Sequence, residues 1–121
     1  MKKILVVDDD PSIRYAIKEG FFTDYDIKTV EDGKNCFKYL ESEIPDLILL
    51  DIMMPKINGW DVIKRLKDRK NWKEIPIIII TAKCDETTKY AGSFYANDLI
   101  EKPFTINDLK KSINNIFLKI K

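Results

Sequence analysis

Acidic, hydroxyl and amine side chains stand at the carboxyl ends of four of the apolar segments of this chain. They are Asp8, Asp9, Asp51, Thr81 and Lys102. A group of carboxylates without His or Cys neighbours favours a hard cation, Mg²⁺ or Mn²⁺. Mg²⁺ leaves room for phosphate oxygens, and a hydroxyl and an ammonium group can bind the same oxygens. These residue types predict phosphoryl chemistry at a metal site, and Asp51 is the candidate nucleophile because it stands alone after its apolar segment.

Short apolar segments alternate with amphipathic stretches along the whole chain. Strands are expected at 4–7, 26–30, 47–50, 75–80 and 99–100, each followed by an expected helix. The helix expected at 85–95 has little apolar stripe. The run of four isoleucines at 77–80 indicates a strand buried on both faces, as in a parallel sheet covered by helices. This alternation predicts an α/β fold of five βα units.

A parallel sheet explains how residues so far apart in the sequence could meet. Ligands of open α/β sheets bind outside the carboxyl ends of the strands. Taken singly, Thr81 fits an ordinary β-branched strand residue, Lys102 a surface lysine, and Asp8 a loop residue or helix cap. Their joint placement at strand ends is what favours a site.

Asp10 is expected to serve a different purpose from Asp8 and Asp9. It precedes Pro11, and proline suits the first position of a helix. We therefore predict that Asp10 is the N-cap of the first helix, because a helix N-terminus favours a negative charge.

Composition narrows the classes of function. The 121 residues suit a single domain over 1–121, and 21 basic residues against 20 acidic ones give no electrostatic reason for a nucleic-acid or membrane partner. The absence of histidine excludes Ser-His-Asp catalysis, His-ligated zinc and a phosphohistidine carrier. No apolar run approaches the ~20 residues of a membrane span, so a cytoplasmic protein is expected, with Cys36 and Cys84 unpaired.

Four motifs resemble the receiver domain of response regulators in two-component signalling. In order along the chain they read "VVDDDPS", "DLILLDIMMPKINGWD", "IPIIIITA" and "EKPF". The resemblance extends to stand-alone regulators of the chemotaxis and sporulation type. It implies a flavodoxin-like (βα)5 fold, a doubly wound sheet of five parallel strands in the order 2-1-3-4-5.

The resemblance also implies the roles of the acidic residues. Asp51 is expected to accept a phosphoryl group from a sensor histidine kinase or a phosphotransfer protein. Asp9, Asp51 and the backbone carbonyl of Met53 are expected to bind Mg²⁺, for which Mn²⁺ can substitute, and Asp8 is expected to act mainly through a bound water. The domain would catalyse only its own phosphorylation and dephosphorylation, and is otherwise no enzyme.

The remaining implied roles concern the response to phosphorylation. Thr81 is expected to be the switch hydroxyl and Lys102 to contact the phosphoryl group, with a cis peptide bond between Lys102 and Pro103. Leu99 occupies the place where the family commonly has a switch aromatic, which puts that part of the coupling in doubt. The fourth helix, poor in apolar residues, the fifth strand and the fifth helix are expected to bind a downstream protein target.

Other functions fit the sequence less well. An EF-hand calcium site is excluded because Ile13 stands where the calcium-binding loop needs glycine. No G-x-G-x-x-G motif follows the first strand, which excludes a dinucleotide site. A Mg²⁺-dependent phosphatase of the haloacid-dehalogenase type, which also has a nucleophilic Asp, stays an enzyme alternative, although it should have a second Asp where Met53 stands. No output domain is expected within 1–121, but a receiver taken from a larger regulator with a DNA-binding or catalytic domain stays open.

Overall fold

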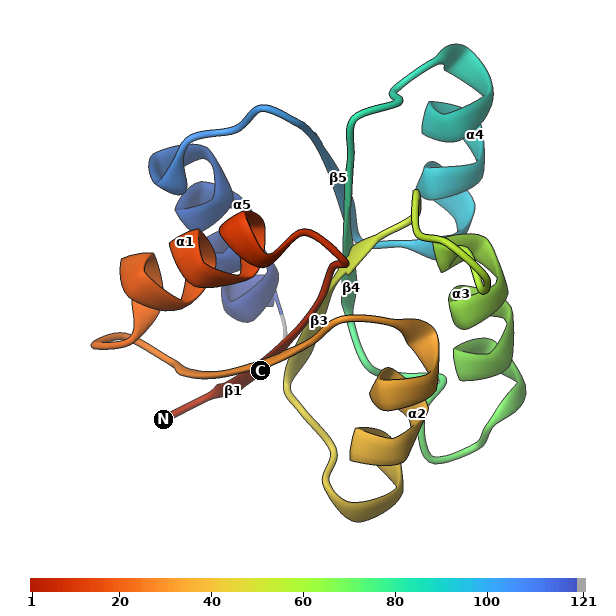
Figure 1. The fold of residues 1–121 in the computed structure, drawn as a ribbon, viewed down its shortest axis with the longest axis horizontal. Helices are drawn as coiled ribbons and strands as arrows, with labels where there is room; N and C mark the ends of the chain where they lie inside the picture. The colour runs from red at the N-terminus through yellow and green to blue at the C-terminus, as the bar shows by residue number, and fades with distance from the viewer. Residues whose placement is uncertain (120–121) are drawn as a thin grey trace.

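Strands and helices alternate along the chain, as the apolar pattern predicted (Figure 1). The computed structural model describes residues 1–119. The strands are β1 (Lys3–Val7), β2 (Asp26–Val30), β3 (Leu47–Asp51), β4 (Ile77–Thr81) and β5 (Asp98–Glu101). The helices are α1 (Pro11–Phe21), α2 (Gly33–Ser42), α3 (Gly59–Asp68), α4 (Glu86–Tyr95) and α5 (Ile106–Lys119).

The strands form one parallel sheet in the order β2-β1-β3-β4-β5. This is the predicted flavodoxin-like order. β3 lies at the centre, and its last residue, Asp51, is in register with Ile80 of β4. The carboxyl ends of β1, β3 and β4 therefore lie side by side at one edge of the sheet.

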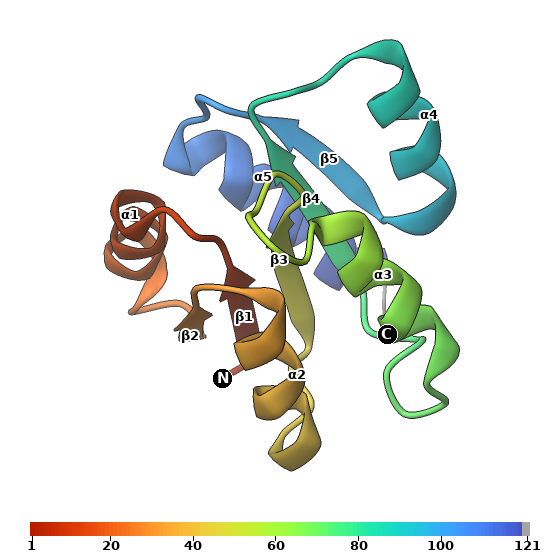
Figure 2. The ribbon, with the colours of Figure 1, turned by 45° about the vertical axis from the view of Figure 1, so that its right-hand side comes forward.

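Two buried clusters fill the two faces of the sheet. α1 and α5 cover one face, and α2, α3 and α4 cover the other (Figures 1 and 2). Alternate residues of each strand belong to opposite clusters, as the period of a strand requires: Leu49 faces α1 and α5, and Leu50 faces α2 and α3. Every residue of β3 and β4 is buried, which agrees with the strand pattern read from the isoleucines.

The predicted start of the fourth strand was two residues early. Ile75 donates its backbone N–H to the carbonyl of Trp72 at 3.1 Å, which closes a turn instead of joining the sheet. Pro76 has no N–H to give to a strand neighbour. β4 accordingly begins at Ile77 and includes Thr81.

Side-chain caps fix where the helices begin. Asp10 accepts a hydrogen bond from the Ser12 N–H at 2.8 Å, so the prediction that it caps α1 is confirmed. Thr105 and Asp108 form a capping box at the start of α5, with bonds of 3.0 and 3.1 Å. Both cysteines are free thiols.

None of the helices within residues 1–119 combines the length and the apolar character that crossing a lipid bilayer requires.

Candidate functional site

The site lies at the carboxyl edge of the sheet. Asp51 is the last residue of β3, and its residue surface is 2% exposed. Asp8 directly follows β1 and is 0% exposed. Two carboxylates are thus buried at neighbouring strand ends, and a buried charge is retained only when it is paired or binds a cation.

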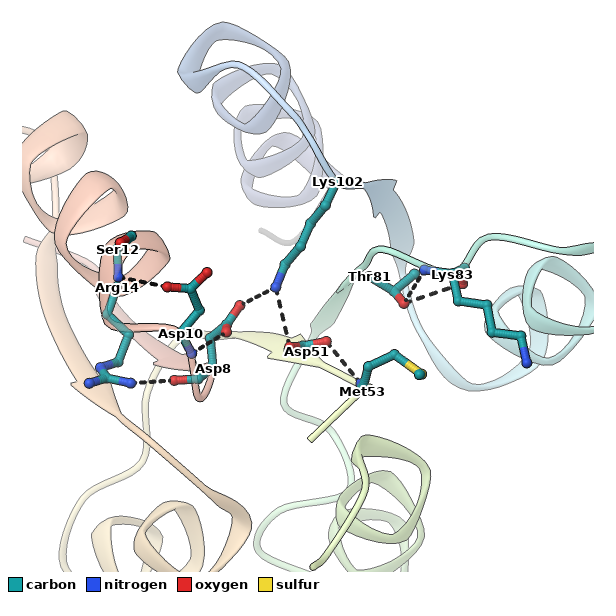
Figure 3. A network of polar contacts seen from close by, with 9 residues as sticks. All are labelled: Asp8, Asp10, Ser12, Arg14, Asp51, Met53, Thr81, Lys83 and Lys102. Atoms are coloured by element: carbon teal, nitrogen blue, oxygen red, sulfur yellow. Dashed lines mark hydrogen bonds and ion pairs between the residues drawn. The ribbon is translucent and has the colours of Figure 1, made fainter. Parts of the chain in front are cut away.

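Lys102 supplies the pairing charge. Its Nζ lies 2.9 Å from Asp8 Oδ2 and 3.2 Å from Asp51 Oδ2, and its side chain is 17% exposed (Figure 3). The lysine enters from the segment after β5 and bridges the two acids. One ammonium group therefore offsets part of the repulsion between two buried carboxylates.

Burial and the neighbouring charges shift the pKa of both partners. Burial raises the pKa of Asp51 above its ordinary 3.8; the Met53 N–H opposes the rise, the Asp8 carboxylate adds to it, and Lys102 opposes it. Burial alone would lower the pKa of Lys102, but its close contacts with the Asp8 and Asp51 carboxylates and their negative charges raise it above 10.5. The lysine therefore stays charged at neutral pH, and Asp51 is the carboxylate that burial disfavours as an anion.

Each buried acid turns one oxygen to the backbone and the other to the lysine. Asp51 Oδ1 accepts from the Met53 N–H at 2.9 Å, and Asp8 Oδ1 accepts from the Asp10 N–H at 2.9 Å. These bonds fix the rotamers of the two carboxylates. The Oδ2 atoms are left facing each other across Lys102 (Figure 3).

The donor set fits a hard divalent cation. Asp8, Asp9 and Asp51 each offer a carboxylate oxygen within 4.8 Å of the others, and Asp9 is the exposed member. Among residues 1–119, Asp8 Oδ2 accepts no hydrogen bond of good geometry, although Lys102 Nζ lies at ion-pair distance. A buried oxygen with a free lone pair, in a set of oxygen ligands only, suits Mg²⁺ or Mn²⁺.

Thr81 stands at the end of β4 with its hydroxyl bound to its own loop. Its Oγ1 accepts from the Lys83 N–H at 3.0 Å and lies 3.2 Å from the Lys83 carbonyl, to which it can donate. Its carbonyl accepts from the Lys102 N–H at 2.7 Å, and the next peptide bond, Lys102–Pro103, is cis. The end of β4 is thus tied directly to the residue that pairs with both acids.

A model of the response regulator receiver domain matches residues 4–114. The chain belongs to this family. Response regulator SaeR from Staphylococcus aureus is 37% identical to this chain over 123 residues. The alignment covers all of this chain and 53% of SaeR. The chain therefore spans about half the length of the curated relatives it matches.

Solved receiver structures share the fold. The receiver domain of Francisella response regulator 1452 is 31% identical, with a TM-score of 0.90 over 100% of both chains. Response regulator protein TrrA from Thermotoga maritima, in complex with Mg(2+)-BeF, is 36% identical, with a TM-score of 0.83 over 96% of this chain and 99% of TrrA.

Two further predicted residues of this receiver domain, Met53 and Leu99, make no polar side-chain contact with the buried acids. The Met53 side chain is 54% exposed and points away from Asp51, while its N–H binds that carboxylate (Figure 3). Leu99, on β5, is partly buried against the cluster under α2, α3 and α4. Their proposed roles, as a carbonyl ligand and at the switch position, stay predictions.

Sequence reasoning did not single out Arg14 as part of the receiver site, and it placed Gly59 in the family's motif after Asp51 without a physical reason for glycine there. A Cβ on Gly59 would lie 2.4 Å from Ile52 Cα, so only glycine lets α3 start this close to the loop after Asp51. Gly59 stands in the motif that contains Asp51, but the sequence gives no sign of this close approach. Arg14 Nη1 donates to the Asp8 carbonyl at 2.7 Å, a contact to backbone for which spacing offers no signal.

Proposed function

We propose that this receiver domain is a phosphorylation-activated signalling switch in which Asp51 accepts the phosphoryl group. The observation that carries the proposal is the buried Asp51 carboxylate at the end of the central strand, with two other acids within 4.8 Å and Lys102 Nζ at 3.2 Å. A carboxylate nucleophile beside one lysine and two other acids suits phosphoryl transfer. A buried ion pair of this kind adds little net stability to a fold.

The reaction would proceed by attack of an Asp51 oxygen on the phosphorus of a phosphohistidine. A P–O bond forms, the P–N bond breaks, and the departing imidazole nitrogen keeps the electron pair and takes a proton from solvent. Lys102 favours the ionised form of Asp51 before transfer and can bind a phosphoryl oxygen afterwards. Thr81 supplies a hydroxyl donor from the adjacent strand end.

Mg²⁺ is the proposed cofactor, and Mn²⁺ can replace it. Asp9, Asp51 and the Met53 carbonyl would hold the ion, and Asp8 would act mainly through water. When bound, the ion stabilises negative charge on the phosphoryl oxygens. The oxygen-only donor set of this chain and the complex formed by TrrA both support this assignment.

The phosphoryl group would change the surface that other proteins bind. It adds about two negative charges and three acceptor oxygens. Thr81 would exchange its bonds to Lys83 for one to this group, and the loop before α4 would follow. Within α4 only Thr88 and Gly92 are buried, so α4, β5 and α5 form the proposed readout face.

The proposed partners follow from this role. A sensor histidine kinase or phosphotransfer protein would supply the phosphoryl group in the cytoplasm, and a downstream protein would bind the readout face. The net charge of +1 supports neither nucleic acid nor membrane as a partner of this domain. Because the chain matches only 53% of SaeR, a longer protein with a DNA-binding or catalytic output domain is the second candidate.

Intact mass after treatment with a small phosphodonor and Mg²⁺ tests the proposal. The wild-type protein should gain the mass of one phosphoryl group, and Asp51→Asn should gain none. Asp46→Asn is the matched control, since Asp46 is an exposed acid just before the other end of β3. A wild-type protein without mass gain, or an Asp51→Asn variant that still gains it, would overturn the proposal.

A further inference from the structure

The loop between β1 and α1 carries two of the three candidate metal ligands, and a side chain from α1 reaches back to hold it. Arg14 Nη1 donates a hydrogen bond of 2.7 Å to the backbone carbonyl of Asp8 (Figure 3). The bond is partly buried and is made by a permanently charged donor. Charge-assisted bonds of this kind are stronger than those between neutral groups.

This bond completes the set of contacts around Asp8. The Asp8 N–H donates to the Val30 carbonyl at 3.2 Å, and the carboxylate is held by the Asp10 N–H and Lys102. The carbonyl held by Arg14 belongs to the peptide unit between Asp8 and Asp9. Because a peptide unit is planar, fixing its carbonyl also fixes the direction in which the Asp9 nitrogen leaves Asp8.

Asp9 is the ligand that most needs such support. Unlike Asp8 and Asp51, it is exposed, so packing does not hold it in place. Its position depends on the backbone on either side, where Asp10 caps α1 and the Asp8 carbonyl is bound by Arg14. A mobile Asp9 would have to be ordered each time an ion binds, which lowers affinity.

The charge of Arg14 by itself would act in the opposite direction. A guanidinium group near a cation site repels the cation, and it donates here to a carbonyl and not to a carboxylate. Removing a cation that acted only by charge would therefore strengthen Mg²⁺ binding. Removing one that positions the ligands would weaken it.

We propose that Arg14 is a positioning residue, which binds the Asp8 carbonyl and thereby holds Asp9 in place for Mg²⁺. The proposal rests on the proposed function, because it assigns to these acids the ion needed for phosphoryl transfer. It adds a residue of α1 to the set that determines affinity for the metal.

Isothermal titration with Mg²⁺ alone tests the proposal, on the wild-type chain and on Arg14→Met, Arg14→Lys and Lys18→Met. Loss of a group that orients metal ligands typically weakens affinity 10- to 100-fold, so about tenfold is expected for Arg14→Met. Arg14→Lys keeps the charge but not the fork of donors, and should be weakened to an intermediate degree. Lys18→Met removes an exposed charge one turn further along α1 and should stay within about twofold.

The nitrogen chemical shift of the Asp9 amide gives a second readout without metal. It should move in both Arg14 variants and stay constant in Lys18→Met. Melting curves verify that each variant is folded, and Arg14→Lys serves if Arg14→Met does not fold. Equal or tighter Mg²⁺ binding by the folded Arg14 variants overturns the role of Arg14 while leaving the proposed function intact. A wild-type chain that does not bind Mg²⁺ overturns both.

Discussion

The carboxyl end of β3 and the helix α4 differ in how firmly their residues are held. Every residue of β3 is buried, and Asp51 is bound by Met53 on one oxygen and Lys102 on the other. On α4, Tyr90 is 69% and Phe94 is 67% exposed, and they contact each other edge to face. The end of β3 therefore holds a few polar atoms in fixed positions, whereas α4 is held by few buried side chains. Low local burial permits a segment to move.

Thr81 connects the two regions. Its backbone belongs to the buried sheet, while its hydroxyl is bound to Lys83 in the loop leading to α4. Changes at the Asp51 end should therefore affect stability and chemistry strongly. Changes on α4 should affect stability little.

Lys102→Met should give the largest loss of stability. It leaves Asp8 and Asp51 buried without their cation, and removing one partner of a buried ion pair typically costs about 3 kcal/mol or more. Urea unfolding in EDTA measures the loss, with Lys110→Met on the exposed side of α5 as the control. Added Mg²⁺ should recover part of the loss, because a ligand of the folded state alone stabilises it. Equal stability of the two variants would contradict this account of the acids.

Gly59→Ala should come next, with a loss of about 2 kcal/mol from overpacking. The new Cβ would lie 2.4 Å from Ile52 Cα and 2.8 Å from the Asp51 carbonyl oxygen, both backbone atoms that cannot step aside. The same urea titration checks the value. A loss below about 0.5 kcal/mol, the range of ordinary surface substitutions, would show that the loop after Asp51 can move to accommodate the added Cβ.

The pH dependence of Asp51→Asn should show a smaller effect with a definite sign. Burial and Asp8 raise the pKa of Asp51 in the folded protein above its ordinary 3.8. Well below pH 3.8 the Asp51 carboxyl is protonated in both the folded and the unfolded protein. As the pH rises through the folded pKa, the wild-type protein loses stability because its buried carboxyl must ionise, and the asparagine variant does not. The unfolding free energy of the variant minus that of wild type, measured in EDTA, should therefore increase from pH 3 toward neutrality. A flat or falling difference would refute the assignment.

Gly92→Ala on α4 should have the smallest effect, within about 0.5 kcal/mol. Its Cβ would meet the Leu99 Cδ1 atom at 3.0 Å, the far end of a flexible side chain that can yield. Alanine also favours a helix over glycine by up to about 1 kcal/mol, which offsets the contact. Thermal melting of this variant beside Gly59→Ala compares the two regions directly, and a loss as large as that of Gly59→Ala would remove the distinction between them.

The candidate site could be predicted from the sequence because its residues stand at the ends of apolar segments. Asp8, Asp51, Thr81 and Lys102 each follow such a segment, and a parallel sheet brings those ends to one edge. The Asp10 cap also depends on neighbouring residues alone, and it was predicted correctly. Local chemistry and strand order were therefore enough for the fold.

Contacts made by long side chains could not be predicted from the positions of the apolar segments. The two distances from Lys102 Nζ to the acids follow from its rotamer, and the bond from Arg14 to a carbonyl six residues earlier depends on how α1 leaves its cap. The early start assigned to the fourth strand has a simpler cause. Ile75 is apolar like its neighbours, but its N–H is used in a turn.

Asp51, and no other acid, is the residue proposed to carry the phosphoryl group. Borohydride reduces an aspartyl phosphate to homoserine, so peptide mass spectrometry after phosphodonor, Mg²⁺ and borohydride treatment identifies the acceptor. We predict homoserine at position 51 alone, dependent on Mg²⁺. Homoserine at another aspartate, or none at all in a folded and fully treated protein, would contradict the account.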